Sequence, residues 1–399
     1  MNYTAEDLNK EVTQHLHFNT GLLSVYLFLG LTGNSCVLYI YTRKMKKTEE
    51  RYFIPMLAVS DIFACLAGII LGIVSNFNRA NYQLDTFCKV GYFFTWTTTS
   101  VSGFLILLIA LNRHLMICRP TSPQLTVVRK RRALIVMVCI AFVTSLPMLY
   151  FLGGRNVPYV FKGQALNATL CTLRFSDGMM NQLQYAYFGF EIFLALLNMM
   201  VTCGLYIPVG VSIYRRFRII QQNSKQRSSS TVLSTISGSV ASPPTHQRLC
   251  VNVPDNETSV MSEASVDMSD NEISTKCATG AKPSETEIKP RVSSLNRRKN
   301  TRRKQARHNF TLMFAMIIII YVLAYVPTLI LVMLPGSNPA QFWFSRSAVE
   351  LNGLVFLQRA FVLNNIVNPF IYSYFDLSFR RELINLLICC RKGQLRSTF

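Results

Sequence analysis

Residues 87–120 read FCKVGYFFTWTTTSVSGFLILLIALNRHLMICRP, and this stretch decides how the rest of the chain is interpreted. Before Arg113 it carries a single charge, Lys89, near its start. Cys88 and Arg113 are 25 residues apart, which corresponds to roughly 37 Å along an α-helix. Such a helix crosses a hydrocarbon core of roughly 30 Å. We therefore expect a membrane-spanning helix with a cysteine at one membrane face and an arginine at the other.

Half of the 399 residues are hydrophobic, and most of them fall in seven long apolar blocks. A soluble domain of this size would not normally keep its apolar residues in such blocks. Each block is long enough to cross a bilayer as a helix. The fold class that we predict is an all-α membrane protein, a seven-transmembrane helix bundle. The blocks lie at residues 21–42, 53–77, 87–112, 133–152, 185–214, 310–334 and 348–375.

The basic residues that give the chain its formal net charge of +21 flank the apolar blocks, so we attribute this charge to membrane topology rather than to nucleic-acid binding. The loops after the first and third blocks are richer in basic residues than the other short loops and the N-terminal tail. Positive residues collect on the cytoplasmic side, which places the N-terminus outside and the C-terminus inside. The two basic loops contain Arg43, Lys44, Lys46, Lys47 and Arg51, and Arg119, Arg129, Lys130, Arg131 and Arg132.

Composition divides the chain into five parts. Residues 1–20 form an extracellular tail without a signal-peptide core, and the first block would serve as its own insertion signal. The long inner loop, 219–305, is Ser/Thr-rich and poor in aromatic residues, which predicts disorder. Residues 377–388 are amphipathic and predict a short helix on the membrane surface. The parts are 1–20, spans one to five at 21–218, the inner loop at 219–305, spans six and seven at 306–375, and the surface helix and tail at 376–399.

Polar residues inside the spans carry the strongest functional signal, because they are costly there unless they are bonded within the bundle. Asn34 lies in span one and Asp61 is the only acid of span two. Span three ends in Asn112-Arg113-His114, and span seven contains Asn368-Pro369-x-x-Tyr372. Together these motifs resemble the rhodopsin-like (class A) G-protein-coupled receptors, over roughly 21–218 and 305–390.

The resemblance implies a mechanism. A ligand bound among the outer halves of the helices shifts a pre-existing equilibrium, span six swings out at its inner end, and Arg113 meets a heterotrimeric G protein. Several residues depart from the family pattern: Asn112-Arg113-His114 stands where the family usually has Asp-Arg-Tyr, Tyr321 and Tyr325 replace the usual phenylalanine and tryptophan, and Asn198 replaces the usual proline of span five. The implied switch residues are Asn112, Arg113, His114, Tyr206, Tyr321, Tyr325, Pro327, Asn368, Pro369 and Tyr372.

The resting state should be weakly restrained. In the family an acid usually precedes the arginine, whereas this chain has the neutral Asn112. Many relatives carry a second acid at the inner end of span six, where counting back from Pro327 gives Arg307. We therefore predict ligand-free signalling. The alternative is a substitute restraint from His114 or from the second inner loop.

The resemblance also implies covalent modifications. Cys88 and Cys171 would form a disulfide on the outer side, where such bonds persist; the alternative is two free thiols. Glycosylation sequons begin at Asn2 and Asn167, both outside on this topology. Two cysteines end the amphipathic stretch just inside the membrane and are candidates for palmitoylation, namely Cys389 and Cys390.

Four polar residues match positions that bind a sodium ion in many family members: Asp61, Ser102, Asn364 and Asn368. Hard oxygen ligands with one carboxylate suit a small cation, and a carboxylate inside a membrane needs a partner or a proton. The alternative is a water-filled polar network without specific sodium. We expect no other cofactor.

The residues at the outer ends of the spans argue against some classes of ligand. Span seven has no lysine for a retinal Schiff base, and Thr95 stands where an aminergic receptor has an acid. Glu191 and Arg359 are the charges that remain, and they either pair with each other or contact a polar ligand. Aromatic walls are expected from Tyr92, Trp96 and Tyr185.

We favour a short peptide, such as a neuropeptide, because the second outer loop is long; a non-peptide small molecule is the alternative. A transporter or channel would show inverted repeats and paired broken helices, and the sequence shows neither. No metal-ligand cluster, nucleophile elbow or phosphate loop indicates an enzyme. The expected partners at the plasma membrane are the G protein, arrestin, receptor kinases and membrane lipids, but not nucleic acid.

Overall fold

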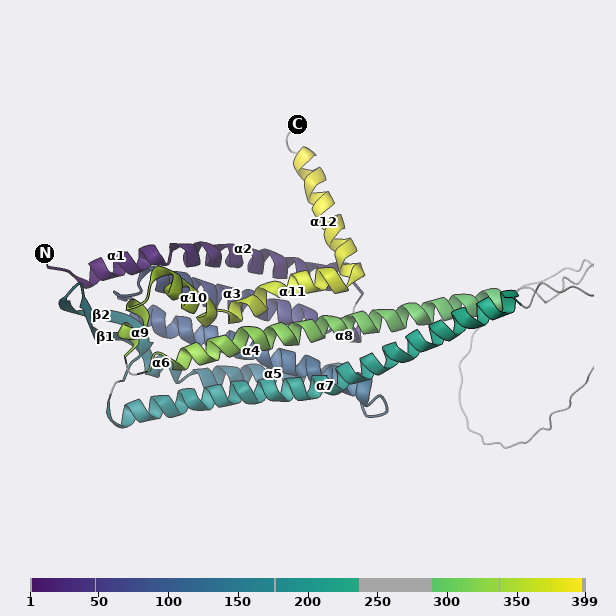
Figure 1. Ribbon diagram of the computed structural model, residues 1–399, viewed down its shortest axis with the longest axis horizontal. Helices are drawn as coiled ribbons and strands as arrows, with labels where there is room; N and C mark the ends of the chain where they lie inside the picture. The colour runs from purple at the N-terminus through teal and green to yellow at the C-terminus, as the bar shows by residue number, and fades with distance from the viewer. Residues whose placement is uncertain (1, 47, 176, 237–288, 337, 397–399) are drawn as a thin grey trace, which may run out of the picture. The chain divides into compact units, whose positions relative to one another are not determined.

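The computed structural model describes residues 2–46, 48–175, 177–236, 289–336 and 338–396. The chain divides into two compact units, Met1–Arg215 with Arg302–Phe399, and Arg216–Thr301. The first unit contains the apolar spans. Its long helices run alongside one another (Figure 1), with α2 packed on α3, α3 on α4, and α11 on both α2 and α3.

Helices dominate the chain, with one two-stranded sheet. The helices are α1 (Ala5–His15), α2 (His17–Tyr39), α3 (Ile54–Phe77), α4 (Asp85–Cys118), α5 (Val127–Ser145), α6 (Met148–Phe151), α7 (Gly178–Ile236), α8 (Lys289–Met333), α9 (Pro339–Phe344), α10 (Ala348–Gln358), α11 (Phe361–Phe375) and α12 (Leu377–Arg396). A π-helical turn, η1 (Ile40–Lys44), extends α2, and a 3₁₀ turn, η2 (Glu49–Arg51), precedes α3. The strands are β1 (Leu152–Phe161) and β2 (Gln164–Leu173).

The seven predicted spans are confirmed, with one modification. Six helical segments of the described chain are long and apolar enough to cross a membrane, and α10 with α11 forms a seventh span bent by 65°. The bend lies at Arg359 and Ala360, between the two helices. Side chains such as Phe28, Phe63 and Leu323 are exposed on the outside of the bundle, as expected for surfaces that contact lipid rather than water.

The predicted inner loop, 219–305, falls partly outside the described residues. Residues 219–236 continue α7 and residues 289–305 continue α8, so both helices run past the boundaries that we expected. Residues 237–288 lie outside the described part of the chain. The amphipathic stretch that follows span seven is helical, as α12, and this helix extends beyond the expected end at Ile388.

An outer layer of structure covers one end of the bundle, and the sequence analysis predicted no element in it. The N-terminal tail forms α1; the apolar residues Leu8 and Val12 of this helix and Leu16, which directly follows it, recur every four residues and are buried. They join a cluster with Val157 of the hairpin and Leu351 of α10. Through this apolar face, the otherwise polar N-terminal tail packs against the hairpin and α10.

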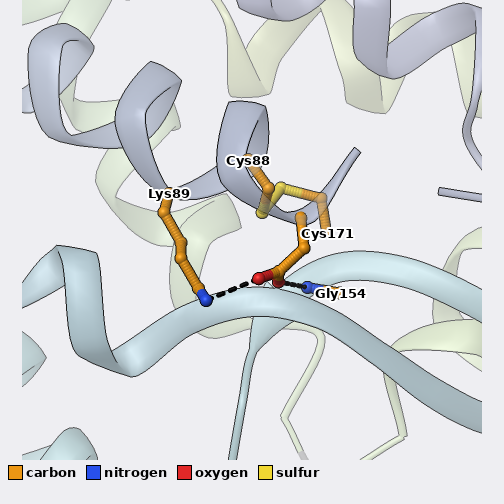
Figure 2. Close-up of a disulfide and its surroundings, with 5 residues drawn as sticks. Cys88, Lys89, Gly154 and Cys171 are labelled. Atoms are coloured by element: carbon orange, nitrogen blue, oxygen red, sulfur yellow. Dashed lines mark hydrogen bonds and ion pairs between the residues drawn. A yellow bond between two sulfur atoms is a disulfide. The ribbon is translucent and has the colours of Figure 1, made fainter. Parts of the chain in front are cut away.

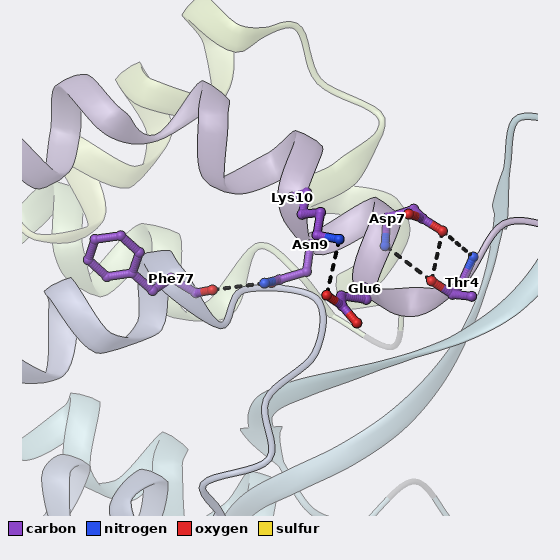
Figure 3. A network of polar contacts seen from close by, with 6 residues as sticks. All are labelled: Thr4, Glu6, Asp7, Asn9, Lys10 and Phe77. Atoms are coloured by element: carbon purple, nitrogen blue, oxygen red, sulfur yellow. Dashed lines mark hydrogen bonds and ion pairs between the residues drawn. The ribbon is translucent and has the colours of Figure 1, made fainter.

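A capping box fixes the start of α1 (Figure 3). The Thr4 hydroxyl accepts a hydrogen bond from the Asp7 backbone N–H, and the Asp7 carboxylate accepts one from the Thr4 backbone N–H. The Thr4 hydroxyl also donates to the Asp7 carboxylate at 2.7 Å. This bond, together with the one from the Thr4 backbone N–H, holds the pKa of Asp7 below its usual value. Asn9 then donates to the Phe77 carbonyl at the end of α3, 2.8 Å away, which ties the tail to the bundle.

Candidate functional site

The disulfide between Cys88 and Cys171 is confirmed, and it fastens the β1–β2 hairpin to the outer end of α4 (Figure 2). Their Cα atoms are 5.8 Å apart, within the usual range for a disulfide. Asp85 adds a second attachment: it pairs with Lys89 at 2.5 Å and accepts the Gly154 backbone N–H at 2.8 Å. The hairpin therefore has a fixed position on α4.

A cavity of about 280 Å³ is bordered by this hairpin and by α3, α4, α7, α8 and α11. Both tyrosines proposed for the switch on α8 also line it, Tyr321 and Tyr325. The hairpin and these two tyrosines therefore border the same cavity. All six residues that the sequence suggested as ligand contacts or aromatic walls lie in its wall, namely Tyr92, Thr95, Trp96, Tyr185, Glu191 and Arg359.

The two outer charges, Glu191 and Arg359, do not form an ion pair with each other. Glu191 Oε2 accepts a hydrogen bond from the Trp96 indole N–H at 2.8 Å, and the side chain is buried. Arg359 Nη1 instead donates to Asn19 Oδ1 and to Asn76 Oδ1, both at 2.8 Å. Of the two alternatives that the sequence left open, the pair between the two charges is therefore not formed in the structure.

Sequence reasoning missed three residues, one in this wall and two that accept hydrogen bonds from Arg359. Arg79 follows the end of α3, lines the cavity, and lies over the Trp343 ring with its Cζ 4.5 Å from the ring centroid. Asn19 and Asn76 are buried and orient Arg359. The available signal for Arg79 was a basic residue two positions beyond the end of α3.

Asp61 lies in a closed polar core. Its carboxylate accepts from Asn368 Nδ2 at 2.7 Å and from the Ser102 hydroxyl at 3.4 Å, and the residue is 0 % exposed. The side-chain oxygens of Asn364 and Asn368 are buried and have no hydrogen-bond partner among the described residues. Unpaired amide oxygens beside a carboxylate suit a hard cation such as sodium, so the predicted residues fit that ion.

Two departures from the family pattern contact each other. Asn198 Nδ2 donates to the Tyr321 hydroxyl oxygen at 3.0 Å and to the Gly103 carbonyl at 3.3 Å. A Cβ atom at Gly103 would lie 3.1 Å from the Tyr321 hydroxyl. The glycine therefore leaves room for a hydrogen bond that joins α4, α7 and α8 in the middle of the bundle.

At the inner end of α4, Arg113 is nearly fully buried and packs on α8. Its Cζ lies 4.6 Å from the centroid of the Phe314 ring, which is a cation–π geometry. Next to it, His114 Nδ1 is 3.2 Å from the Leu205 carbonyl of α7. Tyr206 reaches from α7 to α8 and donates to the Thr311 carbonyl at 2.5 Å.

The start of α12 is joined to the inner end of α2. Tyr372 is buried against the rings of Tyr41 and Phe379. Asp376 accepts from the Tyr41 hydroxyl at 3.0 Å and pairs with Arg51 at 3.2 Å. Asp376 also accepts the Ser378 and Phe379 backbone N–H groups, so it caps α12.

The modification sites are only partly described. Asn2 and Asn167 are exposed, the latter on β2. Cys389 and Cys390 belong to the backbone of α12, and Arg307 to that of α8, but their side chains lie outside the described residues. No group of three or more His, Cys, Asp or Glu side chains in the described chain could hold a metal ion.

Comparison with known proteins identifies the family. The model of the 7 transmembrane receptor (rhodopsin family) matches residues 33–372. The human cholecystokinin receptor type A is 27 % identical over 220 residues, which cover 53 % of this chain and 50 % of that receptor. The mouse neuropeptide Y receptor type 4 is 27 % identical over 150 residues, covering 37 % and 40 % of the two chains. The isotocin receptor of Catostomus commersonii is 26 % identical over 137 residues, covering 34 % and 35 %.

The chain spans half or less of the length of these curated relatives, whereas the family model covers most of the chain from span one to span seven. The matched region includes Asn34, Asp61, Arg113 and the Asn-Pro-x-x-Tyr motif that ends at Tyr372. It is a family of signalling receptors and not of enzymes. The chain is therefore a multi-pass membrane protein and belongs to the rhodopsin family of seven-transmembrane receptors.

Proposed function

We propose that this receptor binds a short extracellular peptide, acts at the plasma membrane and activates heterotrimeric G proteins. The observation that carries the proposal is the cavity of about 280 Å³, whose wall brings the suggested ligand residues together beside Tyr321 and Tyr325. The named relatives, receptors for cholecystokinin, neuropeptide Y and isotocin, favour a peptide over another small molecule.

The signal passes inward through the middle of the bundle. A ligand that contacts Glu191 or Arg359 alters the packing of α7 or α11, and the hydrogen bond between Asn198 and Tyr321 couples α7 to α8. Movement of α8 at its inner end separates Phe314 from Arg113 and opens the surface for the G protein. Any ligand that binds the open state more tightly shifts the equilibrium in this way.

Sodium stabilises the resting state through Asp61, Ser102, Asn364 and Asn368. The support is the buried carboxylate with neutral partners and the unpaired amide oxygens beside it. Such a carboxylate is costly unless a cation or a proton neutralises it.

The resting state is held weakly, so the receptor signals without ligand. Asn112 bonds to the Met116 sulfur at 3.6 Å rather than supplying a carboxylate. Phe314 provides a cation–π contact for Arg113, which is worth about 0.5–2 kcal/mol. His114 contributes a further contact to α7.

We propose the following topology and covalent modifications for the receptor. The N-terminus is extracellular, with glycans at Asn2 and Asn167, and the C-terminus is cytoplasmic. Palmitoyl groups on Cys389 and Cys390 would anchor α12, whose Leu377, Ile384 and Leu387 are exposed as a membrane-contacting surface requires. Receptor kinases and arrestin would act on the cytoplasmic Ser/Thr-rich loop.

A peptide library applied to cells that express the chain, read through several G-protein outputs, tests the function. The expected result is a saturable response to at least one peptide that is lost in Arg113→Ala at equal surface expression. A response that persists in Arg113→Ala, or a change in membrane conductance that survives loss of G proteins, would contradict receptor coupling.

A further inference from the structure

The cavity wall carries more positive than negative charge. Its charged residues are Arg79, Arg155 and Arg359 against Glu191, and Glu191 is bonded to Trp96. None of the three arginines forms an ion pair within the described residues. An arginine side chain does not lose its proton in a protein, so these charges persist at any physiological pH.

Arg359 is held in one orientation by neutral groups. Its Nη1 donates to two amide oxygens, on Asn19 and Asn76, while Asn76 Nδ2 donates to the same Asn19 oxygen at 3.0 Å. The guanidinium lies against the backbone of α3 at Gly72, where a Cβ atom would be 3.3 Å from Nε. Amide oxygens satisfy hydrogen bonds but do not neutralise a charge, so the site keeps an uncompensated cation in a low-dielectric setting.

A second cation faces the same space. Arg79 and Arg359 line the same cavity. The Arg79 Cζ lies 4.5 Å from the centroid of the Trp343 ring, which is a cation–π geometry. Two guanidinium groups with no ion-pair partner among the described residues form a site that favours a planar anion with two oxygens.

We infer that Arg79 and Arg359 form a carboxylate-binding site that receives an acidic group of the ligand, either a free C-terminus or an acidic side chain. This inference rests on the proposed function and specifies the chemistry of its ligand. The cavity, of about 280 Å³, is far larger than one inorganic ion. Tyr82, Tyr92 and Trp343 in its wall provide contact surface for an aromatic or apolar group next to the carboxylate.

The test measures thermal unfolding of the purified full-length receptor in nanodiscs, with neither agonist nor G protein. N-acetyl-L-phenylalanine, which has a carboxylate, is compared with its uncharged carboxamide. Potassium chloride at equal ionic strength is the control for an inorganic anion. We expect the carboxylate alone to raise the apparent melting temperature saturably, by about 2 °C. An equal shift with the carboxamide, or with chloride, would overturn the inference.

Variants of the three arginines of the cavity wall show which of them produce the rise in melting temperature. The response to the carboxylate should be lost in Arg79→Gln and in Arg359→Gln, and retained in Arg155→Gln, which changes the third arginine of the wall. Arg359→Gln also removes two hydrogen bonds, so it changes the packing as well as the charge. Arg359→Lys keeps the positive charge, and Arg79→Gln removes a charge while leaving those two hydrogen bonds in place, so these variants separate the effect of charge from that of folding. Loss of the response only in Arg155→Gln would place the anion elsewhere.

An internal carboxylate provides a test without any added ligand. Asn19 Oδ1 accepts both of its hydrogen bonds, so Asn19→Asp preserves these contacts and adds the missing negative charge. We expect Asn19→Asp to raise the melting temperature of the unliganded receptor and to abolish the carboxylate response. Asn34→Asp, an equally buried change on the same helix, should lower it.

A destabilisation by Asn19→Asp as large as that by Asn34→Asp would overturn the site. These measurements do not involve signalling. A peptide agonist that activates a receptor without a carboxylate response would therefore refute this inference and leave the proposed function intact. A receptor that shows the carboxylate response but is activated by no peptide would refute only the proposed function.

Discussion

Asp61 and Arg359 are opposite charges in equivalent situations. Each lies inside the bundle, and each is held by neutral side chains: Asn368 and Ser102 for the carboxylate, Asn19 and Asn76 for the guanidinium. Neither forms an ion pair within the described residues. They differ in enclosure, because Asp61 is 0 % exposed whereas Arg359 lines a cavity of about 280 Å³.

This difference determines what can neutralise each charge. The closed core around Asp61 admits a proton or a small cation, whereas the cavity beside Arg359 admits an organic anion with its attached body. A charge with only neutral partners remains unpaired until something binds. On these proposals the resting and the liganded states depend on different solutes, and each site can be disturbed without the other.

Loss of the disulfide should have the largest effect, and only on the outer site. Cys88→Ser and Cys171→Ser each release the hairpin that borders the cavity, at a cost of about 2–5 kcal/mol. We expect lower surface expression and loss of the carboxylate response, with the double variant no worse than either single one. Surface labelling and thermal unfolding measure both. Clearly additive losses would show that the thiols act separately.

Asp61→Asn should separate the two sites. Sodium should raise the melting temperature of the wild type, and this response should disappear in Asp61→Asn while the carboxylate response remains. Arg359→Gln should give the reverse pattern. We expect agonist affinity to lose its sodium dependence in Asp61→Asn, a change of about tenfold for each 1.4 kcal/mol of coupling. An equal sodium effect in wild type and variant would exclude Asp61 as the ligand.

Asn112→Asp should lower ligand-free signalling by several-fold at equal surface expression. A carboxylate at this position gives Arg113 a charge-assisted contact, worth about 1.5–3 kcal/mol before exposure reduces it. Phe314→Leu removes the cation–π contact and should raise ligand-free signalling. G-protein reporters in transfected cells measure both variants. Activity equal to that of mock-transfected cells, with receptor at the surface, would contradict weak restraint.

The smallest effect is expected from loss of the hydrogen bond between Asn198 and Tyr321 in the middle of the bundle. Tyr321→Phe removes one hydrogen bond and Asn198→Ala removes two, each worth about 1 kcal/mol, and both variants should shift agonist potency by a few-fold. Because the two side chains bond to each other, the double variant should resemble Asn198→Ala. Leu323→Ala, an exposed residue on α8, is the control. Additive shifts would show that the two positions act independently.

The sequence predicted what depends on long apolar runs and on spaced motifs. The seven spans follow from hydrophobic length, and the Cys88–Cys171 bond follows from the family pattern. The sequence did not reveal the outer layer of α1 and the hairpin. Leu8, Val12 and Leu16 form an apolar stripe too short to predict a packed tail, because most stability of a short helix comes from its tertiary contacts.

The partners of Arg359 were equally hidden. Asn19 and Asn76 lie on helices far from it in sequence, and hydrophobic periodicity does not fix how those helices rotate against each other. The 65° bend at Arg359 also redirects this side chain, and the local sequence contains no proline that would predict it. Arg79 seemed to belong to a loop because it follows the end of span two.

The most direct test of receptor function is guanine-nucleotide exchange by purified heterotrimeric G proteins with the receptor in nanodiscs. The account predicts that, in potassium buffer, the wild type accelerates exchange on at least one G-protein class without ligand. Sodium should slow that exchange, and Asp61→Asn should be insensitive to sodium. Exchange no faster than with empty nanodiscs, for every G-protein class and with a receptor that unfolds cooperatively, would contradict the account.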